Sequence, residues 1–144
     1  MKKIIFMGKT GSGKTTLCQK LDELSLEYKK TQTVEIYNDS IDTPGEYMEN
    51  RSLYNALMTI SVDAKIIALV YDCTQEENYI APGFATMFNK EVIGIITKIA
   101  MATKEDIDLA VEQLTVAGAS RIFKVDTVDD IGVEELRFYL EERE

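Results

Sequence analysis

An octapeptide near the amino terminus has the spacing of a phosphate-binding loop. Residues 8–15 read Gly-Lys-Thr-Gly-Ser-Gly-Lys-Thr, a complete G-x-x-x-x-G-K-[ST] motif between an apolar run and a helix-compatible stretch. Glycines in such a loop permit backbone angles that a side chain would forbid, so successive N–H groups can turn inward around phosphates. We expect Lys14 to reach the β- and γ-phosphates, Thr15 to ligate Mg²⁺ and Thr16 to meet the α-phosphate. The predicted phosphate-binding residues are Gly8, Lys9, Thr10, Gly11, Ser12, Gly13, Lys14, Thr15 and Thr16.

A second motif that suits phosphate chemistry, Asp42-Thr43-Pro44-Gly45, follows a short β-type segment further along the chain. In phosphate-loop proteins a carboxylate at such a strand end holds Mg²⁺, usually through a water, and the glycine N–H can meet the γ-phosphate. We therefore expect Asp42 and Thr15 to be the metal ligands and Gly45 to sense the γ-phosphate. The same residue types also favour an ordinary turn, but the position downstream of a phosphate loop favours the functional interpretation.

Glu46 follows this motif directly, at a place where a glutamine would orient the attacking water. A glutamate beside the γ-phosphate charge is a poor substitute unless it is protonated or turned outward. The predicted catalytic residues are Lys14, Gly45 and Glu46, and the predicted hydrolysis is slow. A switch threonine ordered by Mg²⁺ and γ-phosphate is also expected. Thr31 and Thr33 both lie in the right interval, and the choice between them stays open.

The segment that would recognise the base departs from the pattern for guanine. That pattern is N/T-K-x-D after a strand, in which the Asp accepts two hydrogen bonds from guanine and the Lys stem packs on the ring. Here the segment reads Thr97-Lys98-Ile99-Ala100, so Thr97 and Lys98 fit but the carboxylate is missing. A hydrogen bond to a charged group is worth about 1.5–3 kcal/mol, so its loss weakens any preference for guanine over adenine. Asp126 and Asp106 are candidate replacements, and the expected ligands are GTP or ATP with Mg²⁺.

Alternating strands and helices must position these motifs. Apolar β-type runs predict strands at 3–7, 40–42, 65–71, 91–97 and 121–125, with a short half-exposed strand at 33–37. Helical spacing predicts helices at 16–26, 52–61, 104–117 and 133–142, and a brief helix or loop at 82–89. This alternation predicts an α/β fold in which residues 1–144 form a single three-layer domain, with a mostly parallel central sheet and helices on both faces.

The composition is that of a globular protein with an acidic surface. Apolar residues make up 45% and charged residues 28% of the chain, and the formal net charge is −9. Such a charge argues against nucleic acid and anionic membranes as main partners, and no apolar stretch is long enough for a membrane helix. The absence of histidine excludes Ser-His and Cys-His catalysis and histidine-ligated zinc. Cys18 and Cys73 are expected to be reduced core residues of a cytosolic protein.

On these residues the chain resembles the EutP/PduV family of small GTPase-like proteins associated with ethanolamine and propanediol utilisation. The resemblance spans nearly the whole chain. It rests on residues 8–15, Lys30-Thr31-Gln32, Asp42-Thr43-Pro44-Gly45-Glu46-Tyr47 and Ala81-Pro82-Gly83-Phe84. It implies a Ras-like P-loop fold, nucleotide and Mg²⁺ binding, and a bacterial cytosolic setting tied to microcompartments, with microcompartment or metabolic enzyme proteins as partners. It also implies a link to acetate kinase activity, and Ala100 makes ATP use easier to accept.

Three functions are compatible with these residues, and the oligomeric state is left open. The first is a regulatory or assembly NTPase in which residues 28–37 and 43–52 reorder with the nucleotide state. The second is an ATP-dependent kinase for acetate or a related acid, with Lys9 and Arg51 as candidates to hold the acceptor. The third is a nucleotide-binding scaffold that has lost catalysis.

Overall fold

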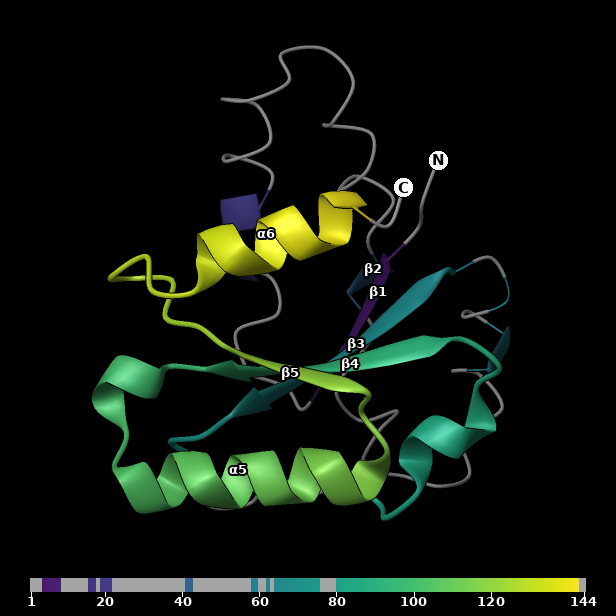
Figure 1. The fold of residues 1–144 in the computed structure, drawn as a ribbon, viewed down its shortest axis with the longest axis horizontal. Helices are drawn as coiled ribbons and strands as arrows, with labels where there is room; N and C mark the ends of the chain where they lie inside the picture. The colour runs from purple at the N-terminus through teal and green to yellow at the C-terminus, as the bar shows by residue number, and fades with distance from the viewer. Residues whose placement is uncertain are drawn as a thin grey trace, which may run out of the picture.

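Strands and helices alternate along the described part of the chain (Figure 1). The computed structural model describes residues 4–8, 16–17, 19–21, 41–42, 58–59, 62, 64–75 and 80–142. Residues 16–17, 19–21 and 58–59 are helical, in agreement with the helices predicted there. The strand predicted at 33–37 lies outside the described residues.

Five strands form one sheet in the order β2-β1-β3-β4-β5, with every neighbouring pair parallel. The register pairs Phe6 with Asp42 and Asp72 with Thr97. Because the strands run in one direction, their carboxyl ends and the loops that follow meet at one edge of the sheet. The strands are β1 (Ile4–Gly8), β2 (Ile41–Asp42), β3 (Ile66–Asp72), β4 (Glu91–Thr97) and β5 (Arg121–Lys124).

Helices cover both faces of this sheet, which gives three layers (Figure 1). Successive strand residues point to opposite faces, so each strand contributes to two apolar clusters. One cluster joins α5 (Lys104–Ala117) to residues such as Ile67. The other joins α6 (Val133–Glu142), together with Leu17 and Leu21, to residues such as Ile66. Every residue of β1 and β3 is buried, as expected for strands covered on both sides.

Helix α5 approaches β4 closely because the strand has a glycine at the contact. A Cβ at Gly94 would lie 2.9 Å from Leu114 Cδ1. The helix begins with a capping box in which the Thr103 hydroxyl accepts from Asp106 N–H and the Asp106 carboxylate accepts from Thr103 N–H. It ends at Gly118, whose φ of 105° is left-handed. These local signals place the loop between β4 and α5 at the carboxyl edge.

The predicted element boundaries are largely confirmed. β4, α5 and α6 have the predicted bounds. β1 and β3 lie one residue further along the chain than predicted, β5 ends one residue earlier, and the segment at 82–89 contains the 3-10 helix η3 (Phe84–Met87). On α5, Ile107 and Val111 are half-buried and pack against the same apolar cluster as the buried Leu114. The deeply buried residues are Ala110, Leu114 and Ala117, whose alanines let the helix lie close to the sheet. Among the described residues, no helix is both long and apolar enough to cross a bilayer.

Candidate functional site

The segments predicted to bind a ligand converge on the carboxyl edge of the sheet. β1 ends at Gly8, the first residue of the phosphate-loop motif, and β2 ends beside it at Asp42. β4 ends at Thr97, and Lys98 follows directly. The loops at this edge form the usual ligand site of an open parallel α/β sheet.

A cavity of about 190 Å³ lies at this edge. Its described lining comes from the first helix, the end of β4, the short 3-10 helix η4 (Ile99–Met101) and the loop after β5. The cavity thus brings together the predicted α-phosphate contact, Thr16, and the three predicted base-binding residues, Thr97, Lys98 and Asp126. The lining residues are Thr16, Thr97, Lys98, Met101, Asp126, Thr127 and Val128.

Lys98 has an unusual backbone conformation at the cavity wall. Its φ is 62°, in the left-handed region that residues with side chains rarely adopt. Its Nζ lies 2.7 Å from Oδ2 of Asp72, and the lysine side chain is 40% exposed. The lysine is therefore constrained at its backbone and at its tip, while its stem remains partly accessible at the cavity.

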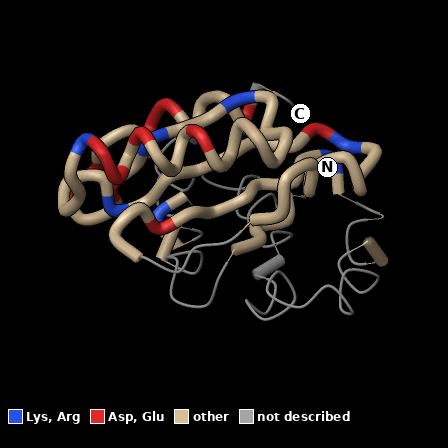
Figure 2. Tube along the Cα trace, turned by 90° about the horizontal axis from the view of Figure 1, so that it is seen from below, with Lys and Arg blue, Asp and Glu red and all other residues tan. Residues whose placement is uncertain are grey.

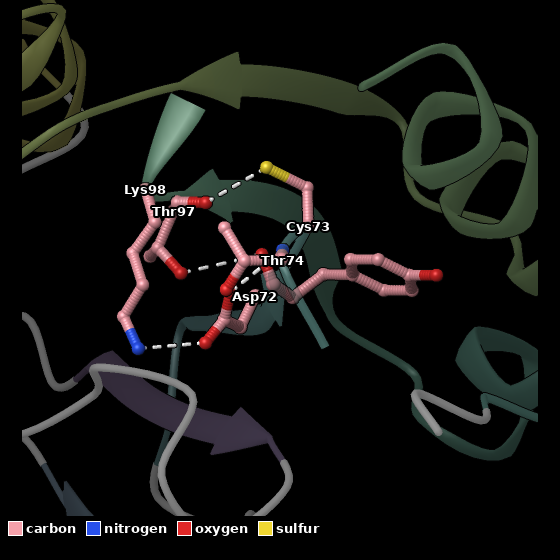
Figure 3. A network of polar contacts seen from close by, with 6 residues as sticks. Asp72, Cys73, Thr74, Thr97 and Lys98 are labelled. Atoms are coloured by element: carbon pink, nitrogen blue, oxygen red, sulfur yellow. Dashed lines mark hydrogen bonds and ion pairs between the residues drawn. The ribbon is translucent and has the colours of Figure 1, made fainter. Parts of the chain in front are cut away.

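Asp72, at the end of β3, is the buried partner of this lysine. Its side chain has no exposed surface. Oδ2 accepts from Lys98 Nζ, and Oδ1 accepts from the Thr74 N–H at 2.8 Å and the Thr74 hydroxyl at 2.6 Å (Figure 3). A buried carboxylate needs such partners to offset its desolvation. Sequence reasoning missed Asp72; the available signal was an acidic residue directly after a nearly continuous apolar run.

Thr97 links the ends of β3 and β4. Its hydroxyl donates to the Tyr71 carbonyl at 3.4 Å, and its carbonyl accepts from Cys73 Sγ at 3.1 Å (Figure 3). Burial, with a smaller effect from the Asp72 charge, raises the pKa of the Cys73 thiol to about 11. The thiol therefore stays protonated at neutral pH and can donate. Cys73 is free and buried, as predicted; Cys18 lies outside the described residues.

Hydrogen bonds to the Asp126 side chain hold the loop after β5 in place. Its Oδ2 accepts from Ala100 N–H at 3.1 Å, and its Oδ1 accepts from the N–H groups of Val128 and Asp129 at 3.0 and 3.1 Å. The residue is 3% exposed, and its backbone exchanges two hydrogen bonds with Ile131. The carboxylate thus connects this loop to position 100, where guanine-binding motifs carry an aspartate. Three backbone donors already use it, so base recognition by Asp126 stays a prediction.

Asp106, the other candidate carboxylate, caps α5 through Thr103 and is not among the described residues that line the cavity.

Most of the residues predicted to bind phosphate and metal lie outside the part of the chain that the structure describes. Those residues are Lys9–Thr15, Thr31, Thr33, Gly45, Glu46 and the side chain of Asp42. Among the described side chains, no group of three Cys, Asp or Glu residues could hold a metal ion.

One family profile and two curated relatives match nearly the whole chain. The profile of the family described as "Ethanolamine utilisation - propanediol utilisation" (PduV-EutP) matches residues 1–142. "Propanediol utilization protein PduV" of Citrobacter freundii is 39% identical over 144 residues, which is 100% of this chain and 96% of that protein. "Probable acetate kinase EutP" of Escherichia coli K12 is 34% identical over 146 residues, covering 97% of this chain and 89% of that protein.

Solved structures share the fold at low sequence identity. Elongation factor SelB of Methanococcus maripaludis, in its apo form, matches 98% of this chain and 32% of its own, with a TM-score of 0.67 at 19% identity. The FeoB G-domain of Methanococcus jannaschii matches 98% of this chain and 97% of its own, with a TM-score of 0.63 at 18% identity. The cytosolic domain of Thermotoga maritima FeoB, in its GMPPNP form, matches 99% and 63% of the two chains, with a TM-score of 0.61 at 22% identity. The fold is that of small GTPase-type G-domains.

Proposed function

The chain belongs to the ethanolamine utilisation–propanediol utilisation (PduV-EutP) family, and from this premise we propose that it is a nucleoside-triphosphate-binding P-loop protein of the small-GTPase type. In this proposal residues 1–144 form one such domain, hydrolysis is slow and depends on Mg²⁺, and the role is regulation or assembly in ethanolamine or propanediol utilisation. The observation that carries the proposal is that the strands leading into both phosphate motifs and into the base segment end at one edge of the sheet.

Residues 8–15 would hold the phosphates, with Lys14 as the principal cation and Thr16 at the α-phosphate. The structure supports this placement because Gly8 ends β1 and Thr16 is in the helix that follows the motif, lining the cavity. A loop between a strand and a helix amino terminus presents N–H groups toward an anion. Such a local arrangement would allow a chain of net charge −9 to bind a polyphosphate.

Asp42 and Thr15 would hold Mg²⁺, which prefers oxygen ligands. The position of Asp42 fits this role, because β2 pairs with β1 and ends next to the strand that leads into the phosphate loop. Bound there, the metal would neutralise charge on the phosphate oxygens. Gly45 would contact the γ-phosphate, and Glu46 in place of a glutamine would keep hydrolysis slow. Thr31 or Thr33 would complete the switch.

GTP and ATP are both candidate ligands. Ala100 removes the carboxylate that would select guanine, and Asp126 is already bonded to three backbone N–H groups. The FeoB cytosolic domain, which has the same fold, is in its GMPPNP form, and this supports nucleotide binding here. It does not distinguish guanine from adenine as the base that this chain binds.

Phosphate release tests the proposed activity. Purified protein with Mg²⁺ and GTP or ATP should turn over below about 1 s⁻¹, and Lys14→Ala should show only background. The experiment would contradict slow hydrolysis if turnover were faster than this. Nucleotide that binds tightly but is never hydrolysed would instead favour the scaffold function.

A second candidate function is an ATP-dependent acetate kinase. It is favoured by the relative named "Probable acetate kinase EutP", 34% identical over 146 residues. Lys9 and Arg51 would hold the acceptor carboxylate. Acetyl phosphate formed from ATP and acetate, measured in a coupled assay, would support it, whereas activity no higher than that of Lys14→Ala would eliminate it.

The proposed setting is the bacterial cytoplasm in association with microcompartments, with microcompartment or metabolic enzyme proteins as partners. Nucleotide state would alter partner affinity through residues 28–37 and 43–52. Limited proteolysis with and without a non-hydrolysable triphosphate tests this mechanism. Protection of both segments by the triphosphate is expected, and equal cleavage in the two states would rule the switch out.

A further inference from the structure

Asp72 lies outside the phosphate and base motifs but is bonded to a residue of the cavity wall. Its Oδ2 is 2.7 Å from Lys98 Nζ, and the two residues come from the ends of neighbouring strands. Asp72 itself is buried and is not among the described lining residues. Its ion pair with Lys98 therefore connects Asp72 directly to the cavity wall.

The carboxylate of Asp72 is itself fixed in orientation. Both the N–H and the hydroxyl of Thr74 donate to Oδ1, so that Oδ2 faces Lys98 and accepts from its Nζ. These are short contacts to an ionisable group, the stronger class of hydrogen bond. The ion pair therefore has a defined direction and does not depend on a freely rotating carboxylate.

Lys98 is held at both ends of its side chain. Its backbone is in the left-handed region, and Met101 N–H donates to its carbonyl at 3.0 Å. Figure 3 shows the stem running from the end of β4 to Asp72. A free lysine side chain samples many rotamers, so anchoring both ends removes most of that freedom before a ligand binds.

β3 and β4 are joined by many contacts besides this ion pair. β3 and β4 pair along their whole length, and Thr97 already links their ends through Tyr71 and Cys73. The strained backbone of Lys98 is a further sign of function, since such conformations cluster at ligand sites. The geometry therefore favours a role at the cavity over one in holding the sheet.

We propose that Asp72 is a positioning residue for the nucleotide base: it holds Lys98 Nζ so that the methylene stem forms a fixed wall of the cavity on which a purine ring can pack. This inference rests on the proposed nucleotide-binding function. It concerns the base end of the ligand alone, so it predicts an effect on nucleotides that is absent for a triphosphate without a base.

Calorimetric titration of the full chain, in Mg²⁺, with GTP, ATP and inorganic triphosphate tests the proposal. Asp72→Asn should weaken binding of the better nucleotide about tenfold and change the affinity for inorganic triphosphate less than about twofold. The matched control is Asp130→Asn, which breaks another 2.7 Å lysine pair, with Lys20, and should leave both affinities unchanged. Thermal melting of each variant confirms folding.

A second pair of variants changes only the partly exposed Lys98. Lys98→Arg keeps a long stem and a cationic donor for Asp72, whereas Lys98→Met keeps an apolar stem without a donor. The proposal predicts that Lys98→Arg retains most of the nucleotide affinity and that Lys98→Met loses it, so it remains testable even if Asp72→Asn does not fold. Equal affinities for Lys98→Arg and Lys98→Met would overturn it.

The failures of the two proposals can be told apart. If the wild-type chain binds nucleotide and Asp72→Asn binds it equally well, only the role of Asp72 is wrong. A parallel loss of inorganic triphosphate binding would also overturn that role, because it would indicate damage beyond the base end. If the wild type binds neither GTP nor ATP, the proposed function fails and the role of Asp72 fails with it.

Discussion

Asp72 and Asp126 are buried aspartates near the cavity: Asp126 lines it, and Asp72 is bonded to the lining residue Lys98. Among the described residues, Asp72 accepts from Lys98 and from the N–H and hydroxyl of Thr74, and Asp126 accepts from three backbone N–H groups. Buried carboxylates with so many donors hold nearby chain segments in place. Of the two, Asp126 has the more structural set of partners, because all of them are backbone groups.

Replacing Asp126 with Asn should destabilise the protein by about 1–3 kcal/mol, because one oxygen acceptor becomes a donor facing backbone N–H groups. Urea unfolding should show a lower midpoint with an unchanged slope. Asp129→Asn is the matched control; Asp129 is exposed, and the change should be within about 0.5 kcal/mol. An unaltered urea midpoint for Asp126→Asn would contradict the role of this carboxylate in holding the loop.

Cys73 should make stability depend on pH in the alkaline range. Burial raises the pKa of its thiol from 9.0 to about 11 in the folded protein. The unfolded chain therefore ionises first, so the stability associated with the neutral thiol is complete below pH 9 and is lost as the pH rises toward 11. Urea unfolding across this range should show a steeper decline for the wild type than for Cys73→Ala. Parallel declines would contradict the predicted contribution of this thiol.

Among the elements, the contact between α5 and β4 depends on a glycine and a leucine. Gly94→Ala should destabilise the fold by about 1–3 kcal/mol, since the new Cβ would lie 2.9 Å from Leu114 Cδ1. Leu114→Ala should also destabilise it by leaving a cavity. In the double variant the new methyl group occupies part of that cavity, so its total loss, measured by denaturant unfolding, should be smaller than the sum. If the loss of unfolding free energy in the double variant equals the sum of the two single losses, the contact between Gly94 and Leu114 does not set the distance between α5 and β4.

Element boundaries could be predicted where the local pattern is strong. β4 is a continuous apolar run, and α5 has an apolar stripe with a glycine directly after its last residue. The left-handed Lys98 and the hydrogen-bonded pairing of Asp126 with Ile131 could not be predicted in the same way. These features depend on partners from other strands and loops, which a local pattern does not contain.

The residues of the candidate site, like the element boundaries, could be predicted only where a local sequence pattern marks them. Thr16, Thr97 and Lys98 were named from motif spacing, and Asp126 was one of two candidate replacement carboxylates. All four line the cavity, and their contacts with a ligand stay predictions. Asp72 was not predicted, because its role depends on Lys98, which is brought to it by the parallel pairing of β3 and β4. A motif identifies residues at the end of its own strand, whereas the neighbouring strand supplies the residue that orients them.

For the whole molecule, charge and topology together favour the carboxyl edge of the sheet as the proposed place for a polyphosphate. The net charge is −9, and Figure 2 marks acidic as well as basic positions along the chain. The described helices α5 and α6 both carry acidic residues in the first turn, where they complement the helix dipole. An anionic ligand is therefore expected to depend on the local lysines and N–H groups at the carboxyl edge.

Nucleotide binding by the intact chain tests this account most directly. Calorimetry of purified protein with Mg²⁺ should show saturable binding of GTP or ATP, and Lys14→Ala should weaken the affinity at least about 100-fold, because the main phosphate cation is gone. Wild-type protein that binds neither triphosphate, or Lys14→Ala that binds as tightly as wild type, would contradict the account.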